Sequence, residues 1–375
     1  MIESVEAFPV SYPEPNDHGR HRAVCLVRIR DQDGHVGWGE ATAYWPEAAV
    51  ACAVLVDALA PGLVGGDPCR NETLMEGLRG QTWWYGTDGV GIAGFALSGI
   101  DVALWDLKGR VLDQRVLDLL GGPTKEELPG IASSHAAHRE IPDMAEEIDS
   151  WLESGLTGVK VGFGKLGDAK LGFEHQRDVD FMRAVRETIG PDKRIMIDCG
   201  VRNRWTVAEA VRRVRAFEEY GLDWIEEPLG ADDPDGYAQL RRATATSIAY
   251  GEREFGPRGV ARILATGTVD VVGLDPGRVG GITGFARACD LLEIARRQGN
   301  AHAWSSAIDA AASLAISWAK PVCHQLEEQP FKGPMQDDLI GGAIVHRDGR
   351  MPEPQGPGLG IEVDEAVVRR FLIDR

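Results

Sequence analysis

Acidic residues end three short apolar segments of the chain, and further polar residues continue the pattern at intervals of 23 to 28 residues. The six positions are Asp198, Glu226, Glu252, Asp275, His302 and Glu327. Carboxylates that share one site repel each other unless a cation lies between them, and oxygen-only ligand sets favour a hard ion such as Mg²⁺. The sequence therefore predicts that Asp198, Glu226 and Glu252 are metal ligands and that they bind one Mg²⁺ ion.

Each interval has the length of one strand, one helix and two connecting loops. Strands that alternate with helices form parallel sheets. Several such units with a polar residue at the end of each strand are typical of a TIM-type (β/α) barrel, whose active site lies at the carboxyl ends of the strands. The pattern predicts strands at 128–134, 157–162 and 194–198 and in the segments that end at Glu226, Glu252, Asp275 and Glu327. It predicts helices at 142–154, 176–188, 207–220, 259–265, 282–298 and 307–319.

The first 125 residues follow a different pattern. Residues 22–30 alternate like a strand, a turn signal at 31–34 follows, and a second strand returns at 35–40, as in a β-hairpin. Helices are expected at 47–64 and 91–120, the second ending at a Gly-Gly-Pro sequence. We therefore predict an α/β protein with an α+β capping domain at 1–125 and a barrel at 126–349. The tail, 350–375, is expected to pack on the capping domain through a turn and short strand at 356–364. In the strand predicted at 22–30, the apolar side chains Ala23, Cys25, Val27 and Ile29 share one face.

Composition narrows the possible partners. The formal charge of −18 over 375 residues disfavours a nucleic acid or an anionic membrane, since both bind basic faces. A small anionic substrate stays compatible, because a bound divalent ion and local Lys or Arg can reverse the sign inside a pocket. Six scattered cysteines without a C-x-x-C pair argue against a zinc site or a disulfide framework. Reduced thiols, an N-terminus unlike a signal peptide and no membrane-length apolar stretch indicate a cytoplasmic protein.

Several motifs together resemble one family. They are Ile100–Gly109, Leu119–Gly122, Trp224–Leu229, Gly251-Glu252, Asp275 with Arg278–Thr283, and Gly356–Asp364. Through these motifs the chain is similar, over essentially its whole length, to the enolase superfamily in its mandelate racemase and muconate lactonizing branch. The resemblance implies a lid domain that closes over a barrel, and a homo-oligomer. It also implies abstraction of a proton α to a carboxylate, with Mg²⁺ stabilising the enediolate.

The resemblance also assigns roles to individual residues. His302 and Asp275 would form a catalytic dyad, in which the carboxylate orients the imidazole and raises its basicity. Glu226 rather than Glu227 would be the metal ligand. Glu327 would hydrogen-bond the substrate carboxylate, with Glu328 as the competing choice. Arg253 would pair either with an anionic substrate or with Glu227, and the substrate-binding set is completed by Glu227 itself and by His135.

Lys160 marks a departure from the family's pattern. The family often carries Lys-x-Lys at the end of the second barrel strand, and this chain reads Lys-x-Gly, with Gly162 in the second position. In racemases the second lysine is one of two opposed bases, so its absence weakens a two-base racemization. Lys160 is expected to act either as the acid or base on this side of the substrate or as a ligand for the substrate carboxylate.

These residues favour a Mg²⁺-dependent acid-sugar dehydratase, since one His–Asp dyad and one lysine suit the loss of water. The runner-up is a racemase or epimerase of a 2-hydroxy or amino acid. A cycloisomerase is less favoured, because that branch tends to use paired lysines. A hypothesis of another class is a non-catalytic or degenerate binding protein. The lid is expected at the polar loop 12–20 and at the segments 44–47 and 83–85.

Overall fold

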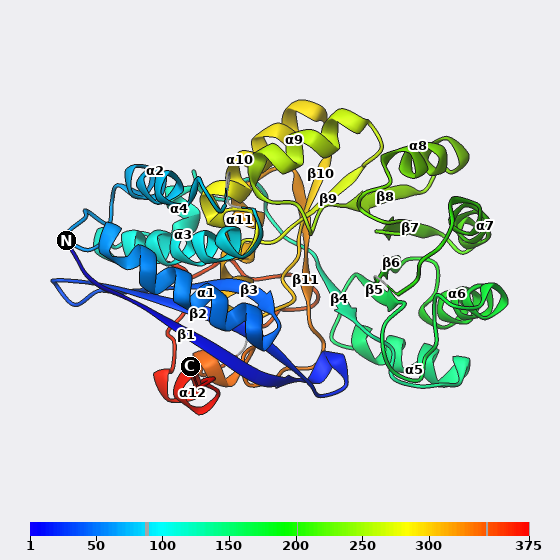
Figure 1. Ribbon diagram of the computed structural model, residues 1–375. Coiled ribbons are helices and arrows are strands. Elements are labelled where there is room, and N and C mark those ends of the chain that lie inside the picture. The colour runs from blue at the N-terminus through cyan, green and yellow to red at the C-terminus, as the bar shows by residue number, and fades with distance from the viewer. Residues whose placement is uncertain (87–89, 201, 343, 375) are drawn as a thin grey trace.

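The computed structural model describes residues 1–86, 90–200, 202–342 and 344–374. It contains a closed barrel of eight parallel strands and, beside it, an antiparallel sheet of three strands (Figure 1). The predicted fold class, a TIM-type (β/α) barrel with an additional capping sheet, is therefore confirmed.

The barrel strands follow the predicted alternation with helices and close in the order β10-β11-β4-β5-β6-β7-β8-β9. Five inward-facing side chains form a small apolar cluster, as expected for the packed interior of such a barrel. They are Ile131, Met196, Trp224, Ala249 and Val271. The strands are β4 (Gly130–Ser134), β5 (Gly158–Phe163), β6 (Arg194–Cys199), β7 (Leu222–Glu226), β8 (Ser247–Tyr250), β9 (Val271–Leu274), β10 (Gln298–Ala301) and β11 (Cys323–Glu328).

The barrel helices differ from the prediction at two places. Helix α8 (Pro234–Ala243), which the periodicity did not reveal, starts at a proline and is capped by the Asp233 side chain. Helix α10 (Gly281–Ala295) ends before the predicted position 298, because Arg296 adopts a left-handed conformation with φ of 55° and Gln298 already belongs to β10. The other barrel helices are α5 (Ile141–Leu152), α6 (His175–Ile189), α7 (Val207–Glu218), α9 (Gly256–Thr266) and α11 (Ala307–Ala319).

The N-terminal sheet consists of β1 (Ile2–Glu14), β2 (Arg20–Asp31) and β3 (Val36–Tyr44). The four alternating residues of β2, from Ala23 to Ile29, pack into an apolar cluster with the helices of this region. Val24 and Leu26 on the opposite face pack into the large cluster that includes the barrel, so the sheet is buried on both faces. The helices are α1 (Pro46–Leu59), α2 (Asn71–Thr82), α3 (Gly91–Leu112) and α4 (Val116–Leu119).

The C-terminal tail runs back along the N-terminal region, but the strand predicted at 356–364 does not form. Only an isolated bridge between Arg115 and Gly358 appears there. The buried carboxylate of Asp106 on α3 accepts hydrogen bonds from the backbone N–H groups of Leu359 and Trp38, both at 2.8 Å. The segment is thus held by side-chain hydrogen bonds instead of a strand ladder. The chain then enters α12 (Glu365–Arg370), and Leu372 bridges to Val10 on β1.

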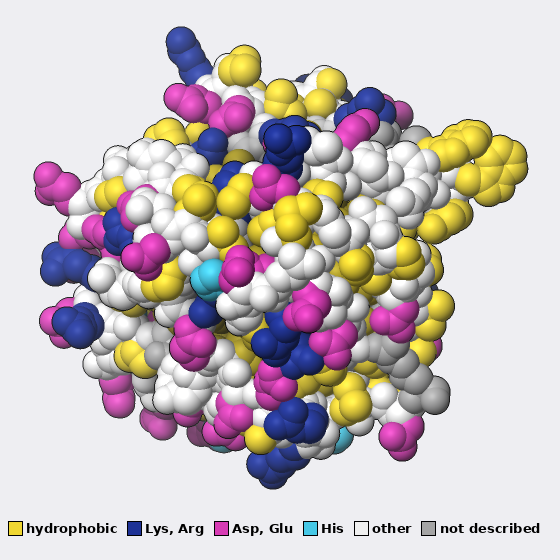
Figure 2. Space-filling model, turned by 90° about the vertical axis from the view of Figure 1, so that its left-hand side faces the viewer, with side chains coloured by type: hydrophobic (Ala, Val, Ile, Leu, Met, Phe, Trp, Pro, Cys, Tyr) yellow, Lys and Arg dark blue, Asp and Glu magenta, His cyan; other side chains and the backbone are white. Residues whose placement is uncertain are grey.

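The surface carries charged side chains of both signs. On the face shown in Figure 2, acidic and basic side chains are interspersed and no broad basic patch is visible. None of the helices within the described ranges is long and apolar enough to cross a membrane. None of the six cysteines forms a disulfide, and the sulfur atoms of Cys289 and Cys323 lie 3.9 Å apart.

Candidate active site

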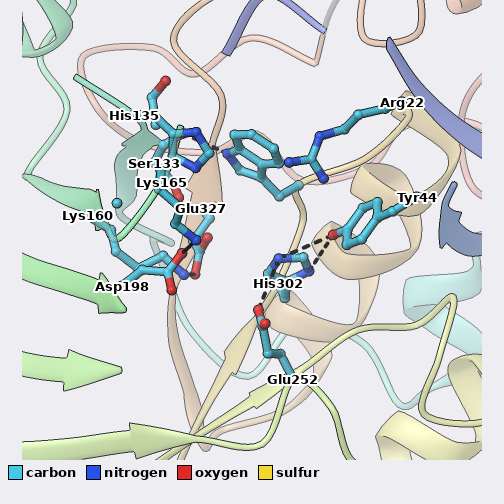
Figure 3. Close-up of a pocket in the computed structure, with 13 residues that line it drawn as sticks. Arg22, Tyr44, Ser133, His135, Lys160, Lys165, Asp198, Glu252, His302 and Glu327 are labelled. Atoms are coloured by element: carbon cyan, nitrogen blue, oxygen red, sulfur yellow. Dashed lines mark hydrogen bonds and ion pairs between the residues drawn. The ribbon is translucent and has the colours of Figure 1, made fainter. Parts of the chain in front are cut away.

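A cavity lies at the carboxyl ends of the barrel strands. Its inner part has a volume of about 80 Å³, and an outer part of about 370 Å³ adjoins it and shares six of its lining residues. Both parts are lined by barrel residues and by residues of β2 and β3 (Figure 3). The inner part is lined by Arg22, Tyr44, Ser133, Ser134, His135, Lys160, Gly162, Lys165, Asp198, Glu252, His302, Trp304 and Glu327.

The three predicted metal ligands stand on successive strands at this end of the barrel. Asp198 on β6 is in register with Glu226 on β7, and Glu252 follows β8 by two residues. Gly273 on β9 leaves room for two of them, since a Cβ there would lie 3.1 Å from Glu226 Oε1 and 3.9 Å from Glu252 Cβ. The strand order thus directs these carboxylates toward one region.

Each of these carboxylates has a different basic partner. Asp198 pairs with Lys165 at 2.9 Å and Glu226 pairs with Lys160 at 2.7 Å. Glu252 lies 3.4 Å from His302 Nε2. Within the part of the chain that the structure describes, no group of three or more Asp, Glu, His or Cys side chains already converges as metal ligands. The carboxylates are therefore turned toward nitrogen groups instead of toward one shared point.

The electrostatics of the carboxylates nevertheless fit a divalent cation. Burial raises the pKa of Glu226 to about 7; Lys160 opposes this rise, and the charges of Asp198, Glu327 and Glu252 add to it. Repulsion of this kind is what a cation among the carboxylates relieves, and an all-oxygen donor set suits Mg²⁺. The residues present therefore fit a hard divalent ion once their side chains turn from the basic partners.

Lys160 lies deep in the barrel between two carboxylates. Its Nζ is 2.7 Å from Glu226 and 2.6 Å from Glu327, and its side chain is 2% exposed. Burial alone would lower the pKa of Lys160, but the charges of these two glutamates outweigh it and raise the pKa well above its ordinary value. The residues two positions away on either side, and so on the same face of β5, are Gly158 and Gly162. A single lysine thus projects from this strand into the site.

A second lysine reaches the cavity from the loop after β5. Lys165 lies over Gly162, where a Cβ would be 2.8 Å from Lys165 Cγ and 2.5 Å from His135 Cδ2. The absence of a side chain at Gly162 therefore makes the space that Lys165 occupies. Burial lowers the pKa of Lys165, but the charges of Asp198 and Glu252 outweigh it and raise the pKa overall. Sequence reasoning missed this residue because it stands in a loop outside the strand periodicity.

His302 and Asp275 are in contact. Asp275 directly follows β9 and its Oδ2 lies 2.9 Å from His302 Nδ1, just after β10. Burial alone would lower the pKa of His302, but the hydrogen bond to Asp275 and the charge of Glu252 outweigh it and raise the pKa to about 9. The ring of Tyr44 lies at the edge of the imidazole, with its hydroxyl 3.4 Å from Nε2. The imidazole is thus held by the barrel on one side and by β3 on the other.

Strand β3 also supports the dyad from behind. Thr42 Oγ1 donates to Asp275 Oδ1 at 3.2 Å. Glu40 is fully buried and accepts hydrogen bonds from the hydroxyls of Ser305 and Ser306. Burial raises the pKa of Glu40 to about 7 against the effect of these hydroxyls. The N-terminal sheet therefore contributes polar groups to the same network as the barrel.

Four other predicted residues lie around this centre. The guanidinium of Arg253 pairs with Glu227 at 2.7 Å, which is the second of the two partners considered for it. Arg253 borders only the outer cavity, and Glu227 borders neither part. His135 stacks on Trp304 with ring centroids 5.0 Å apart, and burial lowers its pKa to about 4. Glu327 faces Lys160, and its Oε2 has no hydrogen-bond partner.

The lid segments differ from the prediction. Residues 12–20 do not form an open polar loop, because Tyr12 and Glu14 belong to β1, and only 15–17 form a short 3₁₀ helix, η1 (Pro15–Asp17). Asn16 exchanges two hydrogen bonds with the backbone of Phe331, at 2.6 and 3.1 Å, which fixes this hairpin tip to the barrel. Trp45 borders the outer cavity. The exposed Trp83 borders a different cavity, between α2, α9 and α10.

The cavity residues that sequence reasoning did not single out come from both the capping sheet and the barrel. Arg22, Trp304 and Lys165 line the inner cavity but lack the regular spacing of the strand-end acids. Tyr44 was expected only as part of a lid loop, and its left-handed backbone, with φ of 62°, ends β3 and points the ring at His302. The basic run Arg20-His21-Arg22 at the start of β2 is the one signal that could have been used.

Comparison with known proteins gives relatives over nearly the whole chain. The chain is 31% identical to the D-galactarolactone cycloisomerase of Agrobacterium fabrum, over 93% of this chain and 91% of that protein. It is 30% identical to the D-gluconate dehydratase of Thermoproteus tenax, over 99% of this chain and 74% of that protein. A racemase from Streptomyces coelicolor solved with bound magnesium superposes with a TM-score of 0.86 at 25% identity, with both chains covered completely.

Two family models match the chain. Residues 17–121 match the mandelate racemase / muconate lactonizing enzyme N-terminal domain. Residues 143–367 match the enolase C-terminal domain-like family. Together with the barrel, the capping sheet and the relatives, these matches confirm the resemblance drawn from the motifs, and the chain belongs to the enolase superfamily, in its mandelate racemase and muconate lactonizing branch.

Proposed function

We propose that this enzyme is a Mg²⁺-dependent acid-sugar dehydratase, which removes water from a sugar acid to give a 2-keto-3-deoxy acid. The observation that carries the proposal is that Lys160 and His302 face one cavity from strands three positions apart in the barrel order. One of these groups can thus remove the α-proton of a substrate while the other protonates its departing β-hydroxyl. Named relatives at 25 to 31% identity are mostly acid-sugar dehydratases, which supports the same reaction.

Asp198, Glu226 and Glu252 would hold the Mg²⁺ ion at the carboxyl ends of β6 to β8. When bound, the ion would stabilise negative charge on the substrate carboxylate. The mutual repulsion of the buried carboxylates supports a Mg²⁺ site at this position. The magnesium bound in the solved structure of the Streptomyces coelicolor relative is consistent with such a site.

The residues of the chain then divide the proton transfers. Lys160 would take the α-proton in its neutral form, which becomes accessible once a cation held by Glu226 offsets the charge that raises the pKa of the lysine. The electron pair of the broken C–H bond then forms a double bond to the β-carbon as the C–O bond breaks. His302, whose raised pKa of about 9 keeps it protonated near neutral pH, gives its proton to the departing hydroxyl, which leaves as water. The enol product takes up one proton at the β-carbon and loses its enol hydroxyl proton, which gives the 2-keto acid. Asp275 holds the imidazole in position, and Glu327 binds the substrate carboxylate.

The test is a substrate library of sugar acids incubated with the protein and Mg²⁺ in D₂O. A 2-keto product that is lost in the His302→Asn variant, while circular dichroism shows that the variant is folded at the assay temperature, supports the dehydratase. Deuterium in recovered substrate without a keto product would instead indicate a racemase or epimerase. If no sugar acid reacts while Mg²⁺ binds to the protein, the dehydratase proposal is wrong.

A second candidate is a cycloisomerase, because the 31% identical relative carries that activity. The same library should therefore contain sugar-acid lactones. A dehydratase product is lighter than its substrate by one water, whereas a cycloisomerase product has the mass of its substrate, so mass spectrometry separates the two reactions.

A further inference from the structure

Arg22 brings a positive charge from the capping sheet into the inner cavity. Its guanidinium lies 4.6 Å from the ring centroid of Tyr44 and 4.2 Å from that of Trp304. Figure 3 shows the side chain entering from β2 and ending beside these rings, on the side of the cavity away from Lys160. Its side chain is 16% exposed, and it borders both parts of the cavity. The two aromatic rings therefore fix a mostly buried cation at the lid end of the site.

The hydrogen bonds of this guanidinium are mostly unused. An arginine has five N–H donors. Across the described ranges, its one side-chain hydrogen bond runs from Nη2 to Asp17 Oδ2 at 3.3 Å, and its Nε is buried without a partner. Buried donors are normally satisfied, so an orphaned one calls for a partner. The side chain also borders the cavity, so its unused terminal N–H groups are available to an acceptor that enters there.

The surrounding charges indicate which acceptor it is. Asp17 is shared, because Arg20 pairs closely with its other carboxylate oxygen, so the two arginines and one aspartate leave an excess of one positive charge. His135, which lies 3.5 Å from the same aspartate, stays neutral near pH 7, because burial lowers its pKa to about 4. An anionic group is therefore favoured over a neutral hydroxyl at this end. A planar guanidinium matches the geometry of a carboxylate.

We infer that Arg22 binds a second carboxylate, at the end of the substrate opposite to the one that reacts, and that the preferred substrates are dicarboxylic sugar acids. This inference rests on the proposed function for the orientation of the substrate, with its reacting carboxylate near Lys160 and Glu327. It makes Arg22 a specificity residue that the capping sheet delivers to the barrel.

The experiment compares sugar acids in matched pairs that differ only in the terminal group, a hexarate and the hexonate of the same configuration. We expect the wild-type enzyme to have the higher kcat/KM for the hexarate. The Arg22→Met variant should lose roughly 10- to 100-fold for the hexarate, the size of a lost charge-assisted hydrogen bond, and less than about 3-fold for the hexonate. Arg22→Lys, which keeps the charge but not the planar fork, should lie between.

Arg28→Met is the matched control. Arg28 lies on the same strand, is 13% exposed, and stacks on the rings of Phe8 and Trp38, but it borders neither part of the cavity. Its loss should leave the hexarate to hexonate ratio unchanged. The inference is overturned if wild type prefers the hexonate, if Arg22→Met lowers both members of a pair equally, or if Arg28→Met changes the ratio as much.

Calorimetric titration of the same pairs into the His302→Asn variant, with Mg²⁺ present, separates this inference from the proposed reaction. Tighter binding of the hexarate that disappears when Arg22→Met is added supports the subsite, even if no sugar acid is turned over by wild type. Turnover of hexonates together with equal binding of both acids would support the dehydratase and reject the subsite. Binding of neither acid would reject the subsite as well.

Discussion

The two ends of the cavity are built in different ways. The barrel end concentrates carboxylates on successive strands, and its lysines and histidine neutralise them pair by pair. The lid end has one buried arginine between aromatic rings and an excess of positive charge. The barrel end is thus arranged for a cation and for proton transfer, whereas the lid end is arranged for an anion. The difference indicates that chemistry and recognition are assigned to separate parts of the chain.

Removal of the divalent cation should have the largest effect on turnover. Mg²⁺ affinity should depend on residues at the barrel end of the cavity and not on residues at the lid end. We expect chelation to reduce turnover by about 10⁴-fold or more, since metal stabilisation of developing charge supplies several kcal/mol, and Mg²⁺ to restore it. Glu226→Gln should weaken Mg²⁺ binding measured by calorimetry, because one carboxylate donor is replaced by an amide. Arg22→Met, at the other end, should leave Mg²⁺ affinity unchanged. Equal Mg²⁺ affinities in all three proteins would remove Glu226 from the ligand set.

The two histidines of the cavity should respond to pH with opposite signs. The pKa of His302 is raised to about 9, above the unfolded value of about 6.5. Its contribution to the free energy of unfolding is therefore fully present below pH 6.5 and is lost as the pH rises toward 9. The pKa of His135 is lowered to about 4, so its contribution is present above pH 6.5 and is lost as the pH falls toward 4.

Each shift corresponds to a few kcal/mol, because one pKa unit is about 1.4 kcal/mol. Urea unfolding of the metal-free protein at several pH values checks this expectation, with His302→Asn and His135→Asn compared to wild type. The destabilisation by His302→Asn should shrink between pH 6.5 and 9. The destabilisation by His135→Asn should instead shrink as the pH falls below 6.5. A pH-independent difference for either variant would contradict the assigned environment of that histidine.

Gly162→Ala should give the smallest of these effects and should act where the two ends meet. The new Cβ would lie 2.5 Å from His135 and 2.8 Å from Lys165, so both side chains must shift. We expect kcat/KM to fall by roughly 10-fold, because a modest displacement of His135 and Lys165 misplaces groups at the site. The melting temperature should change little. Gly77→Ala in α2, where nothing lies within 4 Å, is the control and should keep full activity. An unaltered kcat/KM for Gly162→Ala would show that catalysis does not depend on the observed position of Lys165.

The sequence allowed the barrel end to be predicted more completely than the lid end, for a physical reason. Residues at strand ends recur with the length of a β/α unit, so Asp198, Glu226 and His302 could be found from spacing alone. Arg22 and Tyr44 lie on strands of the capping sheet. The alternation of polar and apolar residues along such strands is the same whether one face covers a core or a cavity, so this alternation does not distinguish them. Lys165 lies in a loop, where spacing carries no information, and the pairing of carboxylates with lysines depends on side-chain positions.

The contacts of β3 bear on how this enzyme could acquire new substrates. Glu40 and Thr42 are partners of Ser305, Ser306 and Asp275, whereas Arg22 belongs to the neighbouring strand. Recombination that exchanged the entire first domain with that of a relative would replace the support of the dyad together with the recognition residues. Exchange of residues 15–22 alone would keep β3 and its partners. The lid thus contains two segments that can change separately: a hairpin tip whose barrel contacts include those of Asn16 and Arg22, and a strand whose polar side chains support the dyad.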